Sequence, residues 1–189
     1  VLINDIWGGD DVIPRYTRPE MGRIWEEPGK LQCMLDVEIA VCEELAKRGE
    51  IPNDALEEIK SKSAFDQERI REIESVTKHD VIAFLTNVAE NVGPSSRFIH
   101  LGLTSSDVLD TGLALQLVSS ANLIINAISV LQDTLRRQAL EHQHTFIAGR
   151  SHGMHAEPTT LGLKIAGWYT EFRRAEERMR NAREMVRVG

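Results

Sequence analysis

The sequence predicts an all-α protein, in which a small N-terminal helical domain precedes the first long helices of a bundle. Three observations predict this class. Helix-capping and helix-ending residues recur along the chain, whereas alternating strand patterns hardly occur. Two long segments, 104–141 and 158–188, space their apolar residues as the seam of a bundle requires. With 42% hydrophobic and 27% charged residues, the composition is that of a globular protein.

The first two predicted helices follow from local signals. Thr17-Arg-Pro-Glu20 fits a capping box, whose two side chains satisfy free amides at a helix start. Pro28-Gly29 is expected to interrupt the chain before a second helix over 30–47. Arg48-Gly49 then ends that helix, because glycine accepts the left-handed conformation found at helix ends. Glu38 breaks the apolar pattern of this second helix.

Three more short helices are expected before residue 93. Each has its own start signal, and Gly93-Pro94 ends the last of them. The expected starts and ranges are Pro52 for 55–61, Asp66 for 67–76, and Thr77 for a helix to Asn91.

The two long segments require packing partners. Residues 104–141 carry a seam with 4,3,4,3,4 spacing and further apolar residues off that seam, so this helix needs neighbours on several sides. Residues 158–188 carry a second seam, opposite a face dense in Arg and Glu. Because 189 residues provide few partners, we expect both oligomerisation and further sequence. The first seam comprises Leu117, Ala121, Ile124, Ile128, Leu131 and Leu135.

Composition excludes several function classes. A net charge of −7 argues against nucleic acid as the main partner. Only two cysteines, Cys33 and Cys42, argue against a disulfide scaffold or zinc cluster and suit the cytoplasm. The least charged stretch, 108–132, contains too many polar residues for a membrane span, so no membrane partner is expected.

A composition shift near residue 100 predicts the domain organisation. We expect an N-terminal arm over 1–12, a helical domain over 13–103, and part of a long-helix bundle domain over 104–189.

Two polar clusters stand at predicted helix starts. Arg15-Tyr16-Thr17-Arg18 offers guanidinium groups beside a helix N-terminus, which suits a phosphate, although a solvated turn before the helix is the simpler explanation of this cluster alone. Thr77-Lys78-His79-Asp80 places a histidine beside a carboxylate, which suits proton transfer, although an exposed capping turn is the alternative.

Two further clusters flank the long helices. His100-Leu-Gly-Leu-Thr104-Ser105-Ser106-Asp107 offers hydroxyls and free amides for a carboxylate or phosphate, although N-capping explains one hydroxyl. In Arg150-Ser-His152-Gly153-Met-His-Ala-Glu-Pro158-Thr-Thr, the glycine and proline predict an irregular loop. Such a loop suits proton transfer better than metal binding, so no metal site is expected.

Taken in order, these clusters resemble the bacterial-type adenylosuccinate lyases of the fumarase/aspartase superfamily, over about residues 13–189. The resemblance implies a C–N lyase that releases fumarate by β-elimination without a cofactor. Its substrates would be adenylosuccinate, giving AMP, and the succinyl-carboxamide ribotide SAICAR, giving AICAR, in purine nucleotide synthesis.

The resemblance also implies residue roles. His152 matches the general acid, Arg15 and Tyr16 match contacts to the phosphate, and Thr104 and Ser105 match donors to the succinyl carboxylate. Lys78, His79, Asp80 and His100 match other substrate-contacting positions, among which His79 assists catalysis. Family members are homotetramers in which three subunits contribute to each active site.

One departure limits the resemblance. The family's general base is a serine on a later flexible loop, which nothing in residues 1–189 matches. We therefore expect an N-terminal fragment that is inactive by itself. Two alternatives stay open: a superfamily lyase for argininosuccinate or aspartate, and a helical assembly module without catalysis.

Overall fold

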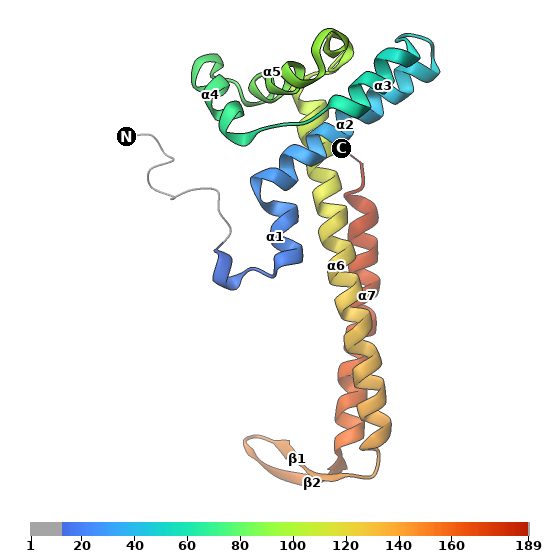
Figure 1. Cartoon of the computed structure of the whole chain (residues 1–189). Helices are drawn as coiled ribbons and strands as arrows, with labels where there is room; N and C mark the ends of the chain where they lie inside the picture. The colour runs from blue at the N-terminus through green and yellow to red at the C-terminus, as the bar shows by residue number, and fades with distance from the viewer. Residues whose placement is uncertain (1–12, 189) are drawn as a thin grey trace. The chain divides into compact units, whose positions relative to one another are not determined.

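A computed structural model describes residues 13–188 of the chain, so the predicted arm over 1–12 lies outside the described residues. Helices dominate the described range, which also contains a two-stranded sheet (Figure 1). The predicted all-α class is confirmed. Two compact units form, one running to Leu117 and including 187–188, the other covering Val118–Val186. The domain boundary between 103 and 104 stays a prediction.

The first unit consists of short helices around a core of its own. Ile59, Phe84 and Val88 are fully buried and belong to one apolar cluster, which α2, α3 and α5 share. Its elements are η2 (Pro14–Tyr16), α1 (Pro19–Trp25), α2 (Glu27–Lys47), α3 (Asn53–Lys62), α4 (Gln67–Thr77), α5 (Asp80–Val92), η3 (Gly93–Phe98) and the beginning of α6 (Ser105–Glu141).

Several predicted helix ends need correction. The Thr17 hydroxyl donates to the Ile13 carbonyl at 2.8 Å and does not cap α1, which Arg18 precedes without a side-chain cap. Pro28 lies in the first turn of α2 and does not interrupt a helix. Thr77 ends α4 and does not begin α5, because Lys78 turns the chain in a left-handed conformation with φ of 54°.

Two other signals are confirmed. The Asp66 carboxylate accepts a hydrogen bond from the Arg69 amide at 2.9 Å, which caps α4. Gly49, with φ of 76°, follows the end of α2, as its missing side chain predicts.

The second unit contains the later part of α6, the strands β1 (Phe146–Ser151) and β2 (Met154–Thr160), and α7 (Leu161–Met185). The helices α6 and α7 lie side by side (Figure 1), and the Gln132 amide donates to Glu176 at 2.5 Å. Within this chain the predicted α6 seam is only partly covered, because Ile124 and Leu131 are each 37% exposed, whereas Ile125, which lies off that seam, is buried.

By length and composition alone, α6 is long and apolar enough to cross a membrane. A single helix of this kind is weak evidence, because core helices of globular proteins meet the same criterion. The expectation of no membrane partner therefore stays a prediction.

Candidate functional site

His152 lies at the tip of a β-hairpin in the second unit. Ser151 pairs with Met154 across the antiparallel strands, which leaves His152 and Gly153 as a two-residue turn. Both turn residues have positive φ, 52° and 72°, as a type I′ turn requires. The predicted irregular loop is therefore wrong, and the hairpin displays His152 on the surface.

A bulge shapes this hairpin. The register shifts between Ala148, opposite Pro158, and Arg150, opposite His155, so β2 holds an extra residue. A side chain at Gly149 would place its Cβ 2.5 Å from the Glu157 carbonyl oxygen, which only glycine avoids. Proline is tolerated beside a bulge because no amide is needed there. The glycine and proline that suggested a loop thus fit an irregular hairpin.

The helix after the hairpin begins later than predicted. Thr160 caps α7 by accepting a hydrogen bond from the Leu163 amide at 3.2 Å, so the helix starts at Leu161 and not at Pro158. The hairpin and α7 are thus directly continuous.

Thr104 and Ser105 stand at the beginning of α6. The Asp107 carboxylate accepts a hydrogen bond from the Thr104 amide at 2.7 Å, as in half of a capping box. In the described part of the chain, the hydroxyls of Thr104, Ser105 and Ser106 form no hydrogen bond. Together with the free amides of the first helical turn, they can bind a carboxylate or phosphate.

His100 precedes this helix start and contacts a residue that the sequence analysis did not select. Its backbone amide donates to Glu38 Oε2 at 2.8 Å, and its ring Nδ1 lies 2.7 Å from Glu38 Oε1. Glu38 is buried on α2. The sequence carried one signal for this contact, because a glutamate stands at an otherwise apolar position of α2 and a buried charge requires a partner.

Lys78, His79 and Asp80 form the exposed turn between α4 and α5. His79 Nδ1 lies 3.4 Å from the Ile82 amide nitrogen, a contact that needs a ring lone pair. The same nitrogen lies 3.5 Å from the Asp80 carboxylate, a contact that needs a ring proton. The Ile82 contact is the hydrogen bond by which His79 caps the start of α5, and 43% of the His79 side chain remains exposed.

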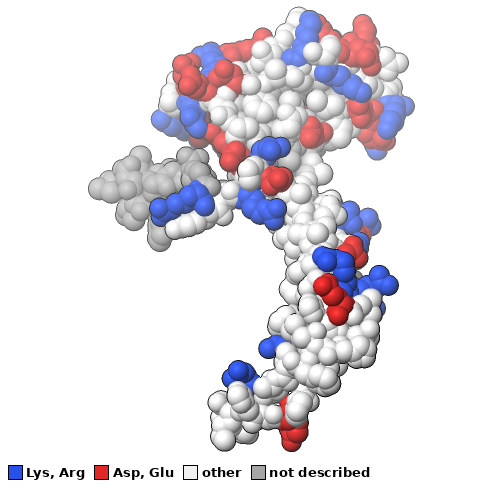
Figure 2. Space-filling model, turned by 60° about the horizontal axis from the view of Figure 1, so that its bottom comes forward, with Lys and Arg blue, Asp and Glu red and all other residues white. Residues whose placement is uncertain are grey.

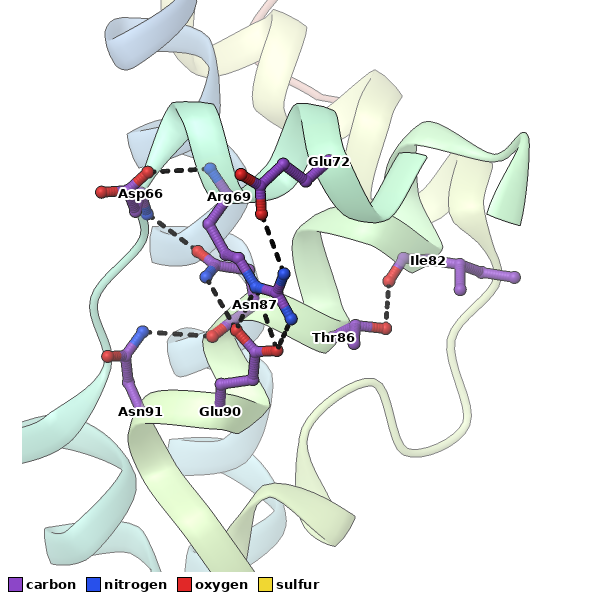
Figure 3. A network of polar contacts seen from close by, with 8 residues as sticks. All are labelled: Asp66, Arg69, Glu72, Ile82, Thr86, Asn87, Glu90 and Asn91. Carbon is purple, nitrogen blue, oxygen red and sulfur yellow. Dashed lines mark hydrogen bonds and ion pairs between the residues drawn. The ribbon is translucent and has the colours of Figure 1, made fainter. Parts of the chain in front are cut away.

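A polar network holds α4 against α5 (Figure 3). The Arg69 guanidinium forms ion pairs with Glu72 at 2.9 Å and with Glu90 at 2.7 Å. The Asn87 Oδ1 atom accepts a hydrogen bond from the Asp66 amide at 2.8 Å. The hydrogen bond from Arg69 lowers the pKa of the Glu90 carboxyl. The network therefore fixes the two helices whose junction carries the candidate residues.

Arg15 and Tyr16 lie in η2, where both side chains are exposed. The Arg15 guanidinium carbon stands 4.8 Å from the centre of the Tyr16 ring, a cation–π geometry that leaves guanidinium N–H groups for an anion.

Metal-ligating clusters and cysteines do not form a second site in the part of the chain that the structure describes. No group of three or more His, Cys, Asp or Glu side chains is placed to hold a metal ion within residues 13–188. Burial, aided by the Glu38 charge, raises the pKa of the Cys42 thiol to about 11. Burial also raises the pKa of Cys33. Both thiols are therefore protonated at neutral pH and poor nucleophiles.

The predicted residues fall into separate groups. His100, Thr104 and Ser105 share one segment, Lys78 to Asp80 another, and Arg15 with Tyr16 a third, all in the first unit. The described hydrogen bonds and ion pairs of these groups stay within each segment or go to neighbouring helices. His152 belongs to the second unit.

Known proteins with similar sequences identify the family. The sequence pattern of the family described as lyase matches residues 15–189. The chain belongs to the lyase family. Among lyases, the adenylosuccinate lyase of Synechocystis sp. is 56% identical over 178 residues, which cover 94% of this chain and 41% of that protein. That of Aquifex aeolicus is 50% identical over 181 residues, with the same coverage. The predicted resemblance to adenylosuccinate lyases is thus confirmed.

A solved structure with a similar fold belongs to an enzyme that is not named as an adenylosuccinate lyase. The 3-carboxy-cis,cis-muconate lactonizing enzyme of Pseudomonas putida superposes with a TM-score of 0.81 at 33% identity, covering 90% of this chain and 41% of that one. The lyase fold alone therefore does not select a reaction. The chain spans about 41% of the length of the curated lyases it matches.

Proposed function

We propose that the protein containing this chain is an adenylosuccinate lyase. It releases fumarate from adenylosuccinate, giving AMP, and from SAICAR, giving AICAR, in purine nucleotide synthesis. The observation that carries the proposal is 56% identity, over 94% of the chain, to a relative of that name. The exposed placement of His152 is consistent with it.

In this reaction a base removes a proton from the carbon beside a substrate carboxylate. A carbon–carbon double bond forms, the neighbouring C–N bond breaks, and its electron pair goes to the departing nitrogen. His152 acts as the general acid that gives this nitrogen a proton. A hairpin tip suits this role, because the ring stands clear of its own unit and can enter a site built from other segments.

The binding groups neutralise the substrate's anionic ends. Arg15 and Tyr16 contact the phosphate, where a guanidinium offers paired N–H donors. Thr104 and Ser105 donate to a succinyl carboxylate through their hydroxyls at the start of α6. Lys78, His79, Asp80 and His100 contact the rest of the substrate, and no metal or cofactor takes part.

The site also requires other chains or segments. We propose a cytoplasmic homotetramer with shared active sites, in which the general base comes from sequence other than residues 1–189. The chain alone is then inactive. Uncovered apolar side chains on α6 support this assembly, since Val130 is 68% and Leu140 59% exposed.

A substrate panel tests the function. The full-length protein is incubated separately with adenylosuccinate, argininosuccinate and aspartate, and fumarate is measured. We expect fumarate and AMP in equal amounts from adenylosuccinate. Fumarate from one of the other substrates alone would favour another superfamily lyase. No fumarate from any of them would favour the assembly module.

A further inference from the structure

Glu38 is a carboxylate in the apolar core of the first unit. It lies on α2 with only 1% of its surface exposed, near the buried side chains of Leu35 and Cys42 on the same helix. A carboxylate in such surroundings destabilises the fold unless hydrogen bonds compensate its lost hydration.

Both oxygens of Glu38 contact one residue, which comes 62 positions later. Oε2 accepts from the His100 amide at 2.8 Å, and Oε1 lies 2.7 Å from His100 Nδ1. His100 adopts φ of 64°, a left-handed conformation that is uncommon for residues other than glycine. Glu38 therefore holds the backbone and the ring of His100 together, in a geometry that a free loop would seldom adopt.

Where the ring carries its hydrogen follows from this contact together with the charge of Glu38, because Nδ1 can donate or accept at this distance. An ionised carboxylate only accepts hydrogen bonds, so the 2.7 Å contact requires a hydrogen on Nδ1. In the neutral ring, Nε2 then keeps its lone pair. The His100 side chain is 24% exposed, so the ring is not sealed inside the core.

We propose that Glu38 is a positioning residue that holds His100 in its Nδ1–H form and presents Nε2 as a hydrogen-bond acceptor. That nitrogen would receive an N–H or O–H group of a ligand bound beside Thr104 and Ser105. The ligand's identity rests on the proposed function, whereas the Glu38–His100 arrangement does not. His79 provides a contrast, because its Nδ1 accepts from the Ile82 amide, so that in a neutral ring the hydrogen stands on Nε2.

Nitrogen NMR tests the arrangement directly. The full-length protein, labelled with 15N-histidine, is studied by magic-angle spinning, and a His100→Asn variant assigns the signal. We expect a protonated, pyrrole-type Nδ1 and an unprotonated, pyridine-type Nε2. An unprotonated Nδ1 in the wild-type protein would overturn the proposal, whatever any variant does.

Glu38→Gln then tests whether the arrangement matters. The amide oxygen can still accept from the His100 backbone, but the NH2 group now faces Nδ1, so the ring hydrogen should move to Nε2. We expect kcat/KM for adenylosuccinate to fall about 10- to 100-fold, the range for groups that orient a metal-binding histidine. Glu44→Gln, an exposed change on the same helix, should alter neither the signal nor kcat/KM.

The readouts separate the two proposals. Wild-type protein that shows the Nδ1–H form but releases no fumarate refutes the proposed function and leaves the arrangement supported. Glu38→Gln with an inverted ring hydrogen and unchanged kcat/KM refutes the positioning role. If Glu38→Gln does not fold, the wild-type spectrum alone still decides the arrangement.

Discussion

The two units differ in how their apolar residues are covered. In the first, Ile59, Phe84 and Val88 are fully enclosed by short helices. In the second, Ile125 and Ile165 are buried, whereas Val130 and Leu140 face outward. In the face shown by Figure 2, acidic and basic side chains are spread over the short helices, and long uncharged stretches follow the long ones.

In the proposed enzyme this difference would give the two units different contributions. The first unit carries its own core and presents the proposed binding residues. The second has apolar side chains that it leaves exposed, together with a hairpin that displays His152, the proposed acid. Predictions that treat the two units differently therefore test this comparison.

The largest effect is expected at the hairpin of the second unit. Asparagine is favoured before glycine in a type I′ turn, so His152→Asn should keep the turn and remove the proposed proton donor. Turnover of adenylosuccinate by the full-length protein should fall about 10²- to 10⁴-fold, with a smaller change in KM.

The control for this variant is His144→Asn, an exposed change between α6 and β1 that should preserve turnover. Wild-type turnover in His152→Asn would remove the assigned acid role.

The next effect concerns stability and compares matched substitutions. Ile59→Ala empties a fully enclosed position of the first unit and should lower the free energy of unfolding by about 2–5 kcal/mol. Ile124→Ala changes a 37% exposed position of the second unit. It should lower the free energy of unfolding less than Ile59→Ala in dissociated chains, and by a larger amount where assembly covers this position. Denaturant unfolding at two protein concentrations measures both.

Equal, concentration-independent losses for the two substitutions would mean that the second unit encloses its apolar residues by itself. The comparison of the units would then be wrong.

A smaller effect is expected at Arg15, the proposed contact to the phosphate. Arg15→Ala removes charged donors from an exposed position, so KM for adenylosuccinate should rise about 10- to 100-fold while kcat changes less. Steady-state kinetics of the full-length protein measure this. An unchanged KM would count against the phosphate contact.

The smallest effect involves the α4–α5 network of the first unit. Arg69 lowers the pKa of the folded Glu90 carboxyl below its ordinary 4.5. The stability from this pair is therefore present above that ordinary value and is lost as pH falls through the lower folded pKa. Arg69→Gln should flatten this acid-side loss, as measured by unfolding across that pH range. An unchanged acid-side profile would show that the pair contributes nothing.

Local signals predicted much of the fold. Contacts within a few residues, which can be read from the sequence, determine three of the predicted features. These are the cap at Asp66, the helix end at Gly49 and the long helix α6. The Thr17 and Thr77 starts failed because each side chain could satisfy an alternative partner, a competition that sequence spacing does not resolve.

The hairpin and Glu38 required the structure. The hairpin contains Gly149 and Pro158 and turns at His-Gly, so it lacks both alternating β-branched residues and the common Asn-Gly turn. The clusters at residues 15, 78, 100 and 152 were recognisable because each joins unusual polar residues locally. Glu38 was not, because its partner His100 is distant in sequence.

Reconstitution from two pieces tests the central proposal most directly. Residues 1–189, wild-type or His152→Asn, are mixed with the separately produced remainder of the full-length protein, and fumarate release from adenylosuccinate is measured. We expect release from the wild-type mixture and neither from residues 1–189 alone nor from the His152→Asn mixture. Release by residues 1–189 alone, equal release from both mixtures, or a silent wild-type mixture would contradict the proposal.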